Sequence, residues 1–284
     1  MKFLNLLFYK SKNLIYSQLL KYNKLSAIVA SGKITQLLLA IFFIAMVLFF
    51  IQRGRKGIKG KLSRLPVLDG IEMAVGRAAE MGRPVHLSVG RGEFRRGTEA
   101  AMTLAGLEVC VYAAQMCARK GASVIFTCSE PAVIPIAEER IKNVYAREGY
   151  AESYDKSVSL LFYDRGAIPL AIHQLLDAKK VGAFIWVGYF GYENIFIAEQ
   201  GVAVGAIQFT WASGAGAASF LVACCEYVLL GSELYAAGAY LSGDPISYNN
   251  IIAEDVLKIS MLILLGISII LFNVGIEMIK ILKY

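Results

Sequence analysis

The stretch "VHLSVGRGEFRRGTEAA" (residues 85–101) decides the fold: an apolar run ends in a glycine- and arginine-rich cluster, and a helix-like stretch follows. Similar apolar runs recur along the chain, and each ends in turn-forming or polar residues. Short β-branched and aromatic runs bounded in this way are typical of strands. The sequence therefore predicts strands at "VHLSVG" (85–90), "SVIFTC" (123–128), "SLLFYD" (159–164), "AFIWVG" (183–188), "AIQFTW" (206–211) and "YVLLG" (227–231).

Helix-length stretches separate most of these runs, for example residues 98–121 and 131–149. Strands that alternate with helices indicate right-handed crossovers and a parallel sheet. The runs are apolar throughout rather than alternating, which is expected of strands covered on both faces. We therefore expect an α/β fold with a predominantly parallel, Rossmann-like sheet flanked by helices.

Two long apolar segments lie outside this pattern. Residues 34–51 form an uncharged run of 18, long enough to cross a bilayer core of roughly 30 Å, and residues 259–279 form a second candidate. Polar and basic residues precede the first run, so it is expected to be a retained anchor rather than a cleaved signal peptide. The predicted organisation is a basic amphipathic segment (1–33), a transmembrane helix (34–51), a basic linker (52–65), the α/β domain (66–250) and a C-terminal helix (251–284) containing the second span.

The net charge of +7 is unevenly distributed. Residues 1–65 contain twelve Lys and Arg and no acidic residue, whereas residues 66–257 contain fourteen Lys and Arg against twenty-one Asp and Glu. An acidic central domain argues against nucleic acid as a partner, and basic flanks suit anionic lipid. The dense cluster after the first span also favours a cytoplasmic central domain. We expect five residues of this cluster to contact the membrane surface: Arg53, Arg55, Lys56, Lys59 and Lys61.

In an open parallel sheet, ligands bind beyond the carboxyl ends of the strands. The first strand end reads Gly90-x-Gly92-x-x-x-x-Gly97, which departs from the dinucleotide spacing G-x-G-x-x-G. Two interpretations stay open: a turn that holds an anion with arginine assistance, or a turn whose arginines meet solvent, neighbouring acids or lipid. The candidate ligand-binding residues at the strand ends are Gly90, Arg91, Gly92, Arg95, Arg96, Glu130, Asp164, Glu193, Gly214, Gly216 and Glu233.

The chemistry-bearing residues predict no catalytic centre. His86 lies inside a strand and His173 in a helix-like stretch, so both are interpreted as structural, and the five cysteines as small buried hydrophobic residues. No Cys/His set has zinc spacing and no G-x-S-x-G is present, so we expect no metal ligand, and no cofactor is indicated. The strand-end carboxylates are read first as helix N-terminal charges, and the uncharged 210–219 stretch as glycines that permit close packing.

Two motifs, "EMGRPVHLSVGRG" (80–92) and "GSELYAAGAYLSGDP" (231–245), resemble an uncharacterised family of bacterial and archaeal integral membrane proteins that contain a domain of unknown function. The resemblance covers about residues 65–280. It implies a membrane topology, an α/β domain and the plasma membrane of a prokaryote. It implies no catalytic residue.

We therefore hypothesise a membrane-anchored cytoplasmic binding or scaffold module that forms a homo-oligomer and has membrane lipid, and other membrane proteins, as partners. The alternative is a nucleotide- or anion-binding enzyme or sensor that uses the first strand end. For assembly, Gly266, Asn273 and Glu277 lie on roughly one face of the second span, where small and polar residues favour helix association. Alternatively, Asn273 and Glu277 lie at the headgroup level of a slightly shifted span. The apolar helix 100–117 and the aromatic turn 188–193 are further candidates for contact with a second copy.

Overall fold

The computed structural model describes residues 34–60 and 65–273, which fall into two compact units. Lys61–Tyr248 contains the sheet, and the segments that end at Gly60 and begin at Asn249 form the other unit. Three predictions concern residues outside the described ones: the amphipathic segment 1–33, the lipid contact of Lys61, and the role of Glu277 in assembly.

The central element of the larger unit is a six-stranded sheet in the order β3-β2-β1-β4-β5-β6, in which every neighbouring pair is parallel. The α/β class and the parallel sheet are therefore confirmed. The strand order reverses between β1 and β4, which lie side by side at the centre. The strands are β1 (Val85–Gly90), β2 (Val124–Cys128), β3 (Val158–Phe162), β4 (Ala183–Tyr189), β5 (Ile207–Ala212) and β6 (Tyr227–Leu230).

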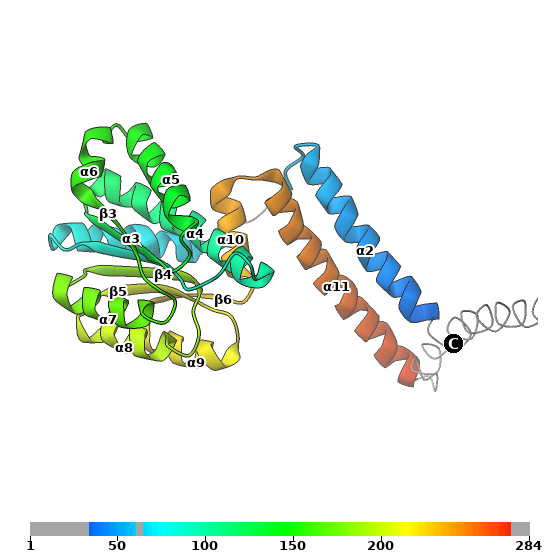
Figure 1. Ribbon diagram of the computed structural model, residues 1–284. Coiled ribbons are helices and arrows are strands. Elements are labelled where there is room, and N and C mark those ends of the chain that lie inside the picture. Colours follow the sequence, from blue (N-terminus) through cyan, green and yellow to red (C-terminus); the bar gives the residue numbers. More distant parts are fainter. Residues whose placement is uncertain (1–33, 61–64, 274–284) are drawn as a thin grey trace, which may run out of the picture. The chain divides into compact units, whose positions relative to one another are not determined.

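Helices cover both faces of the sheet (Figure 1). One face carries α3 (Asp69–Glu80), α4 (Gly97–Lys120), α5 (Val133–Arg147) and α10 (Glu233–Ser242). The other carries α7 (Ile168–Lys179), α8 (Asn194–Ala203) and α9 (Ala215–Cys224). Short helical turns are η1 (Pro66–Leu68), η2 (Ala151–Ser153) and α6 (Tyr154–Ser157).

Two apolar clusters hold these layers together. In β1, alternate side chains enter different clusters: Leu87 packs toward α4, whereas His86 stacks on Phe184 on the α7 side. Every residue of β1 is buried, which is why its sequence is apolar without alternation. The apolar helix α4 contacts the sheet together with α3, α5 and α10, and many of its side chains are buried. The stretch 100–117 is thus largely enclosed within the domain.

Two apolar helices flank the sheet region, α2 (Ile34–Arg55) before it and α11 (Pro245–Asn273) after it (Figure 1). Their large side chains are exposed, for example Phe49 at 60% and Leu262 at 66%. Two helices of the described chain are long and apolar enough to cross a membrane: Leu37–Arg55 within α2, and α4, half of which is buried. Within their unit, the Asn249 amide at the start of α11 donates to the Ile58 carbonyl O, 2.7 Å away.

Candidate ligand-binding site

The carboxyl ends of β1 and β4 bring together residues that are far apart in the sequence. The guanidinium of Arg91, directly after β1, forms an ion pair with Glu193, after β4, at 2.7 Å. The Arg91 backbone N–H donates to the Tyr189 carbonyl O, and the Glu193 carboxylate also accepts from the Gly191 N–H. Two of the predicted strand-end residues thus tie the two central loops to each other.

A second acidic side chain, Glu99, organises the turn between β1 and α4. Glu99 lies in the first turn of α4 and is nearly buried, at 4% exposure. Its carboxylate accepts from the guanidinium groups of Arg165 and Arg96 and from the Glu93 backbone N–H. The hydrogen bond from Arg165 is the main reason that the pKa of Glu99 falls to about 2. Glu99 is therefore ionised at neutral pH, and its carboxylate binds two arginines at once.

Glu130, after β2, completes this arrangement because its carboxylate accepts from the Phe94 backbone N–H at 3.1 Å. In a phosphate-binding turn, backbone N–H groups are the donors to the ligand. Here the N–H groups of Glu93 and Phe94 already donate to carboxylates of the same chain. The structure thus gives the turn neighbouring acids as partners, one of the two interpretations that the sequence left open.

The glycines of this turn are required by close contacts. Gly90 adopts a φ of +77°, and a side chain there would collide with the Tyr189 carbonyl O and the Phe190 ring. A side chain at Gly92 would collide with the Thr103 hydroxyl. Both glycines therefore let the backbone approach its neighbours, a role that needs no ligand.

Other predicted residues are not gathered into this cluster. Arg95 is largely exposed, at 90% of its side chain, and lies 4.0 Å from Glu93. Asp164 accepts from the Gly166 N–H, and Glu233 accepts from the Leu230 N–H, so each carboxylate binds a backbone group of its own turn. Gly214 and Gly216 have open space where a side chain would lie, so the expectation that they permit close packing is wrong.

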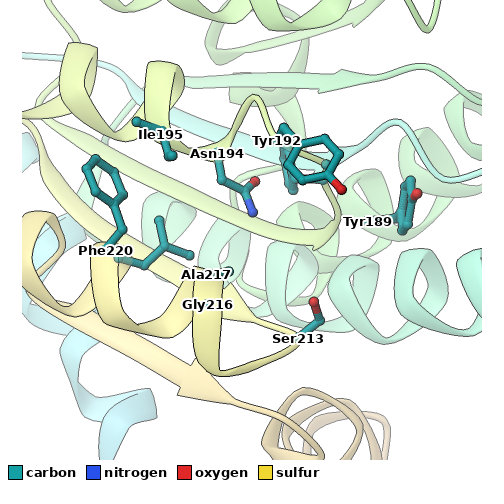
Figure 2. A pocket seen from close by; sticks show the side chains of 11 residues that line it. Tyr189, Tyr192, Asn194, Ile195, Ser213, Gly216, Ala217 and Phe220 are labelled. Atoms are coloured by element: carbon teal, nitrogen blue, oxygen red, sulfur yellow. The ribbon is translucent and has the colours of Figure 1, made fainter.

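A cavity of about 540 Å³ opens beside this cluster, at the carboxyl ends of β4 and β5. One wall is the loop after β4 with the start of α8, and the other is the loop after β5 with α9 (Figure 2). The eleven described residues that line it carry no charged side chain: Tyr189, Phe190, Gly191, Tyr192, Asn194, Ile195, Ser213, Gly216, Ala217, Phe220 and Leu221.

The cavity combines an apolar body with few polar groups. The side chain of Tyr192 is 99% exposed. Phe190 packs edge-on against the buried Trp186, with 5.1 Å between the two ring centroids. Asn194 and Ser213 supply polar side chains, and the first turns of α8 and α9 both border the cavity. This composition is the one expected of a small-molecule site.

Histidines and cysteines have structural surroundings. His86 is fully buried, hydrogen-bonds to the Thr127 hydroxyl at 3.0 Å, and has its pKa lowered to about 3 by burial. All five cysteines are free; four are buried, and burial raises the pKa of the Cys128 and Cys225 thiols to about 12. Among the described residues, no group of three or more His, Cys, Asp or Glu residues is placed to hold a metal ion.

Several residues of this region were not predicted from the sequence. Arg165 follows directly after Asp164 at a predicted strand end, and its position could have indicated a role in the site. Glu93 and Glu99 lie within residues 85–101, but only the glycines and arginines of this stretch were predicted as site residues. Asn194 carried no pattern of its own, and only the fold shows that it lines a cavity.

The described members of the predicted membrane and assembly sets lie on the flanking helices or directly after α2. Arg53 and Arg55 occupy the last turn of α2, and Lys56 and Lys59 follow it. On α11, a side chain at Gly266 would meet open space, and the Asn273 amide donates to the Ile269 carbonyl O of its own helix.

Fold and site together define a parallel α/β domain with an uncharged cavity at the carboxyl ends of two strands, and an apolar helix precedes and follows this domain in the chain. Residues 25–282 match the model of a family described as Domain of unknown function (DUF6754), and the chain belongs to this family. No curated protein matches the chain significantly. No solved structure does so either.

Proposed function

We propose that this protein is a membrane-attached small-molecule-binding module whose ligand occupies the cavity between α8 and α9. The observation that carries the proposal is the cavity itself: about 540 Å³, at the carboxyl ends of two parallel strands, and lined by aromatic, small and neutral polar side chains. Ligand sites of this fold class lie at that edge of the sheet, and their volumes fall within roughly 300–1,000 Å³.

The neighbouring charged cluster supports a binding role in a different way. Its arginines are engaged by Glu193, Glu93 and Glu99, and its turn donates two backbone N–H groups to carboxylates. Replacing these partners by a phosphate costs the ion pairs already made. An anion at the first strand end is therefore the weaker of the two hypotheses, and the cluster instead stiffens the loop that forms one wall of the cavity.

Attachment to a membrane rests on the two flanking helices. Apolar side chains are exposed along α2 and along α11, where water would disfavour them and lipid would not. Basic residues follow α2 directly, which suits anionic headgroups and, by the positive-inside rule, favours a binding domain on the cytoplasmic side of a prokaryotic plasma membrane.

Assembly into a homo-oligomer belongs to the same proposal. The surfaces of α8 and α9 expose Ile195, Phe196, Val202 and Val222, each more than 40% exposed. Exposed apolar surface on a folded domain is characteristic of a contact with another protein. A second copy is the partner we propose, because the flanking helices would hold all copies in the same membrane.

Filling the cavity tests the binding role. Gly216→Leu introduces a side chain into open space on the cavity wall, so we expect the fold to be retained and ligand binding to be lost. The matched control is Ala223→Leu, the same side chain at an exposed position of the same helix. The measurement is thermal unfolding of the detergent-solubilised full chain against a library of small metabolites. Its signal is the fluorescence of Trp186 and Trp211, the two tryptophans of the chain, both in the sheet.

A compound that occupies the cavity raises the unfolding temperature of the wild type and of Ala223→Leu but not of Gly216→Leu. Compounds that stabilise all three proteins equally, or a library without a stabilising compound, would contradict the proposal.

A further inference from the structure

Asn194 is the most informative polar group in the cavity. It is the first residue of α8 and one of the residues that line the cavity. Its side-chain Oδ1 atom is buried, and no described residue donates a hydrogen bond to it. Figure 2 shows the Asn194 amide between α8 and the Gly216–Ala217 turn of α9, with its nitrogen on the side of α9. Buried acceptors in folded proteins are nearly always satisfied, so an exception at a cavity wall points to a donor supplied by a ligand.

The surroundings of this amide limit the shape and charge of that ligand. Tyr189, Phe190, Tyr192 and Phe220 supply aromatic rings around the cavity. Aromatic surfaces favour a flat, apolar partner ring. The described lining offers neither a cation to pair with a phosphate or carboxylate nor an anion to pair with an amine. The ligand that fits is therefore planar and uncharged.

A carboxamide presents an acceptor and a donor side by side. Its complement is a ring edge that carries an N–H donor next to a nitrogen or oxygen acceptor, as in the contact of an asparagine with adenine. We propose that the cavity binds an uncharged nitrogen heterocycle, and that Asn194 recognises it through paired hydrogen bonds. This inference rests on the proposed function and specifies the chemical class of its ligand.

The test compares two probes that differ in one hydrogen-bonding group. 9-Methyladenine carries an amino donor beside a ring acceptor, and 9-methylpurine has the same ring without the amino group. Both compete with fluorescent 2-aminopurine for the full-length protein in detergent, and fluorescence reports the displacement. We expect 9-methyladenine to bind about ten-fold more tightly, because one net hydrogen bond is worth about that factor.

The variant Asn194→Leu tests whether Asn194 recognises the ligand, because a purely structural role of Asn194 would not change the preference between the two probes. It removes the amide but keeps the side-chain size, and it should reduce the preference to less than two-fold while retaining displaceable binding. Because Oδ1 has no partner among the described residues, the variant should unfold at or above the wild-type temperature. Ser213→Ala, on the opposite wall, is the control and should keep most of the preference.

Three results would overturn the inference. The first is equal affinity of the two probes for the wild type, and the second is a ten-fold preference that survives Asn194→Leu. The third is no binding of any of the three purines, while metabolites of another class stabilise the wild type but not Gly216→Leu. That last result would leave the proposed binding role standing. A cavity that no compound of the library reaches would overturn both.

Discussion

At the residue scale, Glu99 makes the central contacts of the charged cluster, because its carboxylate binds two arginines and a backbone N–H group. Its carboxylate is nearly buried and accepts from Arg165 at 2.9 Å and from Arg96 at 3.1 Å. Removing one partner of such a group leaves the others without compensation. The charged cluster should therefore respond strongly to the loss of this single negative charge.

Glu99→Gln should destabilise the protein by about 1.5–3 kcal/mol at neutral pH, the size of a hydrogen bond to a charged group. The folded pKa of about 2 lies below the unfolded value of 4.5. The stabilisation is thus complete above pH 4.5 and disappears as pH falls toward 2. Denaturant unfolding of wild type and variant between pH 7 and 3 measures it. The exposed Glu152→Gln serves as a control, and a stability difference that does not shrink in acid would contradict the assignment.

His86 titrates in a different range. Burial lowers its folded pKa to about 3 from 6.5, so the unfolded chain binds the proton more readily. The stability that His86 contributes as a neutral side chain is complete above pH 6.5 and falls as pH decreases toward 3. His86→Phe should flatten the loss of stability between pH 6.5 and 5, although it also removes the hydrogen bond to Thr127. Identical slopes in wild type and His86→Phe would refute this.

At the scale of elements, α4 lies close to the sheet because small residues face it. A side chain at Gly106 would collide with the Val187 carbonyl O of β4, and Gly238 of α10 approaches Ala105 of α4 in a similar way. These glycines set the distance between the layers. The sequence did not predict this role of the glycines, because it depends on neighbours in space; from the sequence, α4 was recognisable only as an unusually apolar helix.

Gly106→Ala should cost about 1–3 kcal/mol of unfolding free energy, the usual range for forcing extra volume into a packed interface. The matched control is Gly76→Ala in α3, where a side chain meets open space and the change should stabilise by about 0.5–1 kcal/mol. Chemical denaturation followed by tryptophan fluorescence distinguishes the two. Equal effects of the two substitutions would mean that α4 does not approach β4 this closely.

At the scale of the whole molecule, the proposed membrane attachment would determine which compartment supplies the proposed ligand. We predict that Cys introduced at Glu152, an exposed position of the central domain, stays unlabelled by an impermeant thiol reagent in intact spheroplasts and reacts after lysis. The background is Cys224→Ser, because the other four cysteines are buried. Cys at position 12, before the first span, should show the opposite pattern. Labelling of position 152 in intact cells would reverse the topology.

The sequence by itself determined the elements: six strands within one or two residues of their observed ends, the helices between them, and the two apolar helices around the sheet. Periodicity, turn residues and run length are local properties, so they are readable without a structure. The strand order was decided only by the tertiary structure, because it depends on how whole crossovers pack. That order places Arg165 on Glu99, 66 residues away, and sets α8 and α9 around one cavity. Such contacts form only when segments far apart in the sequence pack together, so no single stretch of the chain predicts them.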